Sequence, residues 1–189
     1  MDSPLVRSGL TYEDLLRLSR SSGRHEIFDG ELFTSPVPSL SHQRTAQRLA
    51  RAFEEAVRDG SRVLASGADV VLAPGTVARP DLLLVLADRL DIVSEAGDIG
   101  DMVRGAPDLI LEILSAATVR LDRVIKMDAY ARYSVPEYWL VDGSAKLIEI
   151  FRLDRHAQLY RLTETCHAGD RAGTPLLPGL AVEVGRLFG

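Results

Sequence analysis

Two short stretches of sequence define the centre of this protein: RPDLLLVL at residues 79–86 and PDLILEIL at residues 107–114. Each is an apolar run of the kind that forms a strand buried on both faces of a sheet, and each carries a carboxylate. Glu112 interrupts the second run. A lone buried carboxylate costs several kcal/mol unless it is paired, protonated or bound to a metal. We therefore expect Glu112 to have a partner, with a divalent cation shared with Asp81 as the sharpest candidate and an internal salt bridge as the alternative.

The bulk composition fits one domain with a sizeable core. Of the 189 residues, 46% are hydrophobic and 26% are charged, which argues against a disordered chain. We predict a single domain over residues 1–189. No apolar run approaches the roughly 18 residues of a membrane span, and the first residues lack the order of a signal peptide. One cysteine, Cys166, excludes an internal disulfide and a cysteine zinc cluster, so we expect a cytoplasmic protein without membrane contact.

The net charge of −5 argues against a protein that coats nucleic acid through its overall charge. It is compatible with an enzyme that contacts phosphates locally. Arg44, Arg48 and Arg51 share one predicted helix, where a solvated helix face is the favoured interpretation. Lys126, taken alone, is also more typical of a solvated helix position.

Apolar spacing and turn residues predict an α/β or α+β domain whose mixed central sheet is flanked by few helices. The expected helices are a short one from Tyr12 to Gly23, a long one capped by Ser39 or Ser41 and ending near Asp59, and a third over 118–133. Asp29-Gly30 predicts a hairpin turn. The remaining expected strands cover residues 62–65, 68–73, 81–86, 107–114, 137–141, 146–153 and 158–162. Residues 87–106, with three glycines and no period, are expected to form a long loop.

The third helix gives the site its chemistry. Helical spacing places Asp122, Lys126 and Tyr130 on one stripe, and Val124 is expected to face the core. Since this helix directly follows the Glu112 strand, it could bring the Lys126 ammonium near both carboxylates. Two acids and a lysine are the minimal set for metal-dependent phosphodiester cleavage: the acids hold Mg²⁺, which activates a bound water, and the lysine orients that water or stabilises negative charge. An all-oxygen ligand set suits Mg²⁺ or Mn²⁺ rather than zinc.

Several motifs follow one another in a fixed order along the chain. They are HEIFDGEL at 25–32, residues 39–42, RPD at 79–81, PDLILEILS at 107–115, Asp122-Arg123 with Lys126 and Tyr130, VPEYWLVD at 135–142 and LPGL at 177–180. Together they resemble the Uma-type restriction endonucleases of the PD-(D/E)XK nuclease superfamily. The resemblance extends from about Tyr12 to Phe188.

The resemblance implies a restriction-endonuclease-like core, Mg²⁺ dependence and nuclease chemistry. Carried over by position, Asp81 and Glu112 would be the metal ligands. The superfamily's usual lysine two positions after the glutamate is replaced by Leu114, and Lys126 on the following helix takes its place. Glu26 matches an N-terminal acid that completes the metal site in many superfamily members, although a solvent-facing position beside the hairpin is equally compatible with the sequence. Residues 115–118, Ser-Ala-Ala-Thr, depart from the family's Ser-Pro-Ser-Thr.

The leading hypothesis is a Mg²⁺-dependent endonuclease that hydrolyses DNA, with Asp81, Glu112, Lys126 and Glu26 as catalytic residues. We expect a homodimer, because two sites can cut two strands. His42 could contact phosphate or serve a structural role. One alternative is a nuclease fold that serves as a binding or assembly module with little catalysis, motivated by the negative charge and the lack of a recognisable specificity domain. Another is a two-carboxylate glycosidase, which the sequence disfavours because it shows no sugar-binding aromatic set.

Overall fold

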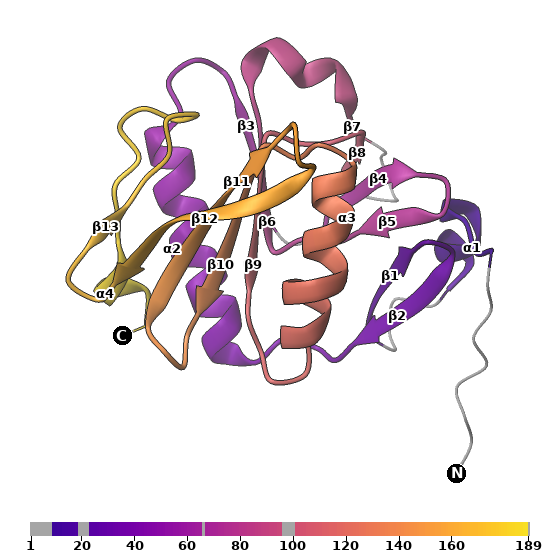
Figure 1. The fold of residues 1–189 in the computed structure, drawn as a ribbon, viewed down its shortest axis with the longest axis horizontal. Coiled ribbons are helices and arrows are strands. Elements are labelled where there is room, and N and C mark those ends of the chain that lie inside the picture. Colours follow the sequence, from indigo (N-terminus) through magenta and orange to yellow (C-terminus); the bar gives the residue numbers. More distant parts are fainter. Residues whose placement is uncertain (1–8, 19–22, 66, 96–100, 189) are drawn as a thin grey trace.

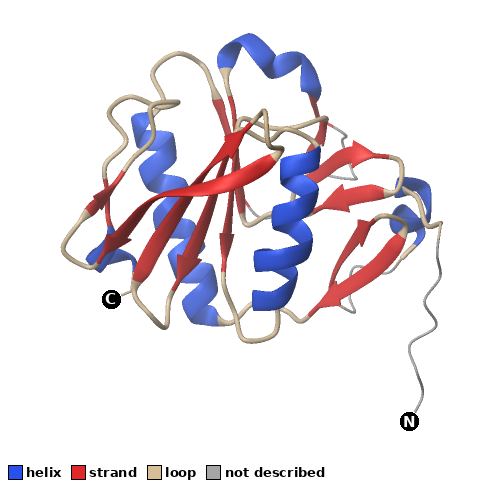
Figure 2. Ribbon diagram, in the orientation of Figure 1, coloured by secondary structure: helices blue, strands red, loops and turns tan. Residues whose placement is uncertain are grey.

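A computed structural model describes residues 9–18, 23–65, 67–95 and 101–188. Its centre is a six-stranded sheet (Figures 1 and 2). In spatial order the strands are β12 (Leu159–His167), β11 (Leu147–Asp154), β10 (Glu137–Asp142), β9 (Leu109–Ile113), β6 (Leu82–Val85) and β3 (Arg62–Ala65). The β9 and β10 strands run parallel, and the other neighbours are antiparallel. The expected mixed central sheet is therefore confirmed.

Helices cover both faces of this sheet (Figure 1). On one face lies α2 (Leu40–Ala56), whose Phe53 packs edge-on against Trp139 with ring centroids 5.6 Å apart. On the other lie the π-helical turn η4 (Leu121–Lys126) and the helix α3 (Met127–Arg132), whose Tyr130 packs against Tyr138. Because β6, β9 and β10 are covered on both sides, their sequences are almost continuously apolar.

A second six-stranded sheet lies beside the first. Its strands, in spatial order, are β2 (Glu31–Ser35), β1 (Arg24–Phe28), β5 (Thr76–Ala78), β4 (Asp69–Ala73), β8 (Asp101–Arg104) and β7 (Val93–Glu95), and α1 (Tyr12–Arg17) packs next to them. The β1–β2 hairpin turns at Asp29 (φ 51°) and Gly30 (φ 79°), as the sequence predicts. Positive φ at both central residues is the conformation that a tight two-residue hairpin requires.

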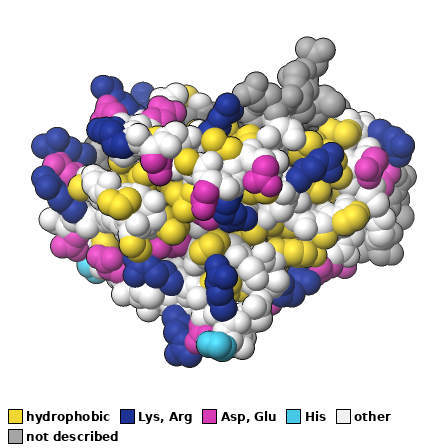
Figure 3. All heavy atoms as spheres, turned by 90° about the horizontal axis from the view of Figure 1, so that it is seen from above, with side chains coloured by type: hydrophobic (Ala, Val, Ile, Leu, Met, Phe, Trp, Pro, Cys, Tyr) yellow, Lys and Arg dark blue, Asp and Glu magenta, His cyan; other side chains and the backbone are white. Residues whose placement is uncertain are grey.

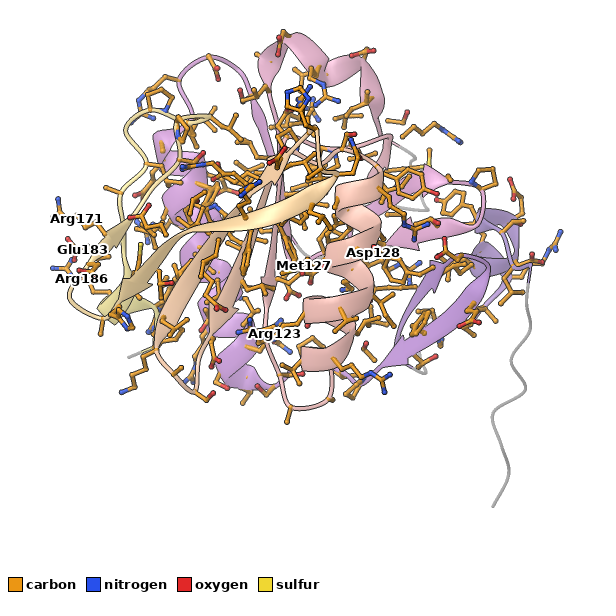
Figure 4. The ribbon with its side chains drawn as sticks, in the orientation of Figure 1. Arg123, Met127, Asp128, Arg171, Glu183 and Arg186 are labelled. Atoms are coloured by element: carbon orange, nitrogen blue, oxygen red, sulfur yellow. The ribbon has the colours of Figure 1, made fainter. Side chains whose placement is uncertain are left out.

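The C-terminal segment folds back along the central sheet. It contains β13 (Arg171–Ala172), β14 (Val182–Glu183) and the short helix α4 (Val184–Leu187). Figure 4 shows Glu183 close to Arg171 and Arg186, and its carboxylate forms ion pairs with them at 3.0 and 2.5 Å. Thr45 and Arg48 of α2 both donate hydrogen bonds to the Leu187 carbonyl. These contacts fix the end of the chain against α2.

The molecular surface carries both charge signs. On the face shown in Figure 3, Lys and Arg side chains are interspersed with Asp and Glu. Within the described ranges, none of the helices combines the length and apolar character needed to cross a bilayer.

Three expectations from the sequence are wrong. Residues 87–106 do not form one long loop, because their described parts include the 3₁₀ helix η2 (Ala87–Ile92), β7 and β8, and β8 pairs with the distant strand β4. The first helix ends at Arg17, well before Gly23. In the third helix Val124 is 58% exposed, since the π-helical turn rotates Asp122 and Lys126 toward the core in its place.

Candidate active site

Asp81 directly precedes β6, and Glu112 lies on the neighbouring strand β9 of the central sheet. The antiparallel register of β6 and β9 pairs Leu82 with Leu111, and one step further along places Asp81 opposite Glu112. Side chains directly opposite each other in a sheet lie on the same face, which here is the face that α3 covers. Asp81 Oδ2 accepts a hydrogen bond of 2.8 Å from the Ile113 backbone amide, and each carboxyl residue is only 1% exposed. The structure thus brings the two acids together at a buried position.

The Lys126 ammonium lies among three carboxylates. Its Nζ is 2.9 Å from Glu112 Oε1, 3.0 Å from Glu26 Oε1 and 3.2 Å from Asp122 Oδ1. Burial alone would lower the pKa of Lys126, but these carboxylates raise it well above its ordinary value, so the amine stays charged. The π-helical turn makes this position possible, and such turns occur often at functional sites.

Glu26 belongs to the same cluster and does not face solvent. It is 0% exposed, and its Oε1 also accepts a 2.8 Å hydrogen bond from the Arg79 backbone amide. Its Oε2 is buried and has no hydrogen-bond partner among the described residues. Glu26 therefore holds Lys126 in place with one oxygen and keeps the other available.

Arg24 is a member of the site that the sequence analysis missed. Its Nη2 lies 2.5 Å from Asp81 Oδ1, and its Nη1 lies 3.9 Å from Glu112 Oε2. Burial would lower the pKa of Arg24, but the surrounding carboxylates raise it, so the guanidinium is charged. The sequence did indicate its position. Side chains alternate between the two faces of a strand, so Arg24, two residues before Glu26, lies on the same face of β1 as Glu26.

The cluster carries more negative than positive groups. The four carboxylates face two permanent cations, Arg24 and Lys126, which leaves an excess of two negative charges when all are ionised; the acids are Glu26, Asp81, Glu112 and Asp122. Burial raises the pKa of Glu112 well above its ordinary range, and Lys126 offsets this only in part. For Asp81 burial acts in the same direction, but His42 and Arg24 outweigh it and lower the pKa.

This charge imbalance fits a divalent cation. Carboxylate oxygens suit Mg²⁺, which commonly needs only one or two of them and completes its shell with water. The unpartnered Oε2 of Glu26 adds a further oxygen nearby. Within the described ranges, no set of three or more His, Cys, Asp or Glu side chains is arranged to ligate one ion.

The acids lie at the floor of a cavity of about 570 Å³. His42, in the first turn of α2, reaches the floor, with Nε2 3.0 Å from Asp81 Oδ1. Arg44 and Arg48 are exposed, as the sequence predicts, and they line one wall of the cavity. Arg51 is also exposed and pairs with Glu55 at 2.8 Å. The other walls come from residues 35–39, 113–115, 117–118, Gly143, Ser144, Leu187 and Phe188.

The aromatic side chains near the site are core residues. Tyr130, Tyr138 and Trp139 are each fully buried, so they pack inside the protein and do not present faces on which bases could stack. Tyr130 also donates a 3.0 Å hydrogen bond to Glu112 Oε1. Together with Lys126, it fixes one oxygen of Glu112 and leaves the other directed to Arg24.

Comparison with known proteins agrees with the fold and with the motif order. The sequence model of the Uma2 family, described as "Putative restriction endonuclease", matches residues 12–185. A crystal structure of a putative nuclease belonging to DUF820 from Anabaena variabilis ATCC 29413 is similar with a TM-score of 0.75 at 18% identity, covering 95% of this chain and 97% of that chain. Among curated proteins, no sequence matches. The length of the family match shows that this chain belongs to the Uma2 family of putative restriction endonucleases.

Proposed function

We propose that the protein is a Mg²⁺-dependent endonuclease that hydrolyses phosphodiester bonds in DNA. The observation that carries this proposal is the pair of buried carboxylates, Asp81 and Glu112, at the floor of a cavity with the Lys126 ammonium 2.9 Å from Glu112. Membership of a family of restriction endonuclease type supports nuclease chemistry.

In this proposal Asp81 and Glu112 hold the metal, which when bound polarises the phosphate and lowers the pKa of a coordinated water. The protein groups supply orientation. The Ile113 amide fixes one oxygen of Asp81, and Lys126 with Tyr130 fixes one oxygen of Glu112. Lys126 also provides a permanent positive charge beside the position of the reacting phosphate, where negative charge develops.

Cleavage of supercoiled plasmid and of circular single-stranded DNA by the purified protein tests this proposal. We expect nicked and linear products with Mg²⁺ and none with EDTA, and a loss of at least about a hundredfold in Glu112→Gln, as for removal of a key transition-state contact. Asp108→Asn is the matched control, because Asp108 is a buried carboxylate preceding the same strand and is paired with Arg89 outside the cavity. Equal activity in Glu112→Gln and wild type would show that a contaminant does the cutting.

A second candidate function is a nuclease fold that binds without cutting. It is favoured by Arg24, whose guanidinium already bridges Asp81 and Glu112 at 2.5 and 3.9 Å and could replace a metal permanently. Calorimetry with Mn²⁺ separates the two candidates. Binding that is lost in Asp81→Asn supports the nuclease, whereas no binding in wild type supports the inactive module. The homodimer also stays a prediction, for which light scattering on the purified protein is the measurement.

A further inference from the structure

We infer that the α2 wall of the cavity binds the phosphates of an unpaired nucleic-acid strand, through Arg44 and Arg48. This inference rests on the proposed function, because it concerns the substrate of the same site. Both residues line the cavity that holds Asp81 and Glu112. They are four residues apart on a helix of 17 residues, so they lie on one side of α2 and follow one another along the wall.

Neither arginine is paired with a carboxylate of the residues that the structure describes. Arg44 is exposed and has no ion pair within the part of the chain that the structure describes. Arg48 donates a 2.8 Å hydrogen bond to the Leu187 carbonyl, a neutral group that positions the guanidinium and leaves its charge in place. By contrast, Arg51, one turn farther along, is paired with Glu55 and does not line the cavity.

The floor of the cavity makes such cations necessary. Asp81, Glu112 and Asp122 line the cavity and Glu26 lies buried beside them, so that an approaching phosphate meets an excess of negative charge when all four are ionised. The protein as a whole, at −5, does not attract a polyanion. Two unneutralised guanidinium groups on one wall provide the local attraction, and guanidinium geometry suits bidentate binding of phosphate.

The depth of the site favours an unpaired strand over a duplex. Asp81 and Glu112 are each 1% exposed, so a reacting phosphate must enter the cavity to reach them. Its volume of about 570 Å³ is that of a pocket for one small ligand, in the usual range of about 300–1,000 Å³. A duplex is stiff and bends only at a cost, whereas a single strand can turn into a pocket. The same cavity also has apolar surface against which an unstacked base could pack. Phe188 and Val37 line it, and Val37 is 73% exposed.

Fluorescence anisotropy tests the inference with a labelled 20-nucleotide single strand and with the same strand in a duplex, both in EDTA so that no turnover occurs. We expect the wild type to bind the single strand at least tenfold more tightly than the duplex. Arg44→Ala should weaken single-strand binding about tenfold, the effect of one charge-assisted hydrogen bond, and reduce the slope of log K against log salt by about 0.7. Arg44→Lys keeps the charge and should recover most of the affinity, and Arg51→Ala should match wild type.

Equal affinity of Arg44→Ala and wild type, or an equal loss in Arg51→Ala, would overturn the phosphate assignment. A duplex bound as tightly as the single strand would overturn the choice of substrate. Because the readout is binding, the result is independent of cleavage. If circular single-stranded DNA is cut with Mg²⁺ but Arg44→Ala binds the strand as tightly as wild type, the proposed nuclease stands and this inference is removed. The expected binding pattern, with neither the single-stranded circle nor the plasmid cut, does the reverse.

Discussion

Replacing Arg24 by glutamine should strengthen binding of a divalent cation and weaken the metal-free fold. Arg24 lies against both carboxylates to which we assign the metal, with Nη2 2.5 Å from Asp81 Oδ1 and Nη1 3.9 Å from Glu112 Oε2. A cation bound by the same oxygens must either displace the guanidinium or tolerate its positive charge nearby. The Arg24→Gln variant keeps a hydrogen-bonding side chain and removes that competition.

The distances set the size of both effects. Unit charges about 4 Å apart interact by roughly 1 kcal/mol in water and about 4 kcal/mol at an effective dielectric constant near 20. Even about 1.4 kcal/mol from the lower part of this range changes Kd tenfold, so we expect Mn²⁺ to bind Arg24→Gln at least ten times more tightly. Without metal, the lost hydrogen bond between two charged groups should cost about 1.5–3 kcal/mol of unfolding free energy.

Isothermal titration with Mn²⁺ and urea unfolding in EDTA measure the two quantities. The matched control is Arg89→Gln, because Arg89 also pairs with a buried aspartate, Asp108, at 2.7 Å but lies outside the cavity. It should lose stability without any change in Mn²⁺ affinity. Weaker Mn²⁺ binding in Arg24→Gln than in wild type would refute the reasoning, since it would mean that Arg24 organises the carboxylates for the metal and does not compete with it.

Further predictions concern the fold and its buried groups. Lys126→Met should cost about 3–5 kcal/mol in urea unfolding, because it leaves buried carboxylates without their cation; a stability equal to wild type would contradict the ion-pair cluster. Gly30→Ala should lower the melting temperature, since Gly30 has φ 79° and a Cβ there would lie 2.7 Å from the Gly9 amide nitrogen, whereas Gly169→Ala, with open space around it, should not. Burial raises the pKa of Cys166 to about 12, so the native thiol should resist alkylation at pH 8 and react only after unfolding; fast reaction of native protein would contradict the structure. The pKa of Glu112 is higher in the folded protein than its ordinary 4.5, so the folded state binds a proton more tightly than the unfolded state does. Glu112 should therefore make the stability of the metal-free protein fall as the pH rises above about 4.5. A smaller fall in Glu112→Gln than in wild type checks this.

The centre of the fold could be predicted from the sequence because its strands carry a local signature. Burial on both faces makes β6, β9 and β10 continuously apolar, and the acids stand out against that background. The proximity of Lys126 to Glu112 also followed from local order, since a short connection joins the strand to the helix.

Features that depend on distant contacts could not be predicted in the same way. The three-residue strand β5 pairs with the distant strand β1 through Val77 and Ile27, and β8 pairs with the distant strand β4. The π-helical turn is not encoded by simple periodicity, so Val124 was expected inside. The role of Arg24 in the site could not be predicted because its partner Asp81 is 57 residues away in sequence and directly precedes a strand of the other sheet.

The buried charged cluster at the cavity draws its members from both sheets. Arg24 and Glu26 come from the β1 strand of one, and they hold Asp81 and Lys126, which belong to the other and its covering helix. A small hinge-like separation of the β1–β2 hairpin would therefore dismantle the charged cluster while leaving the helices and most backbone hydrogen bonds intact. On mild heating, the protein should then lose ligand binding at a lower temperature than it loses its circular dichroism signal. Ligand binding is therefore the more sensitive measure of partial opening of this molecule.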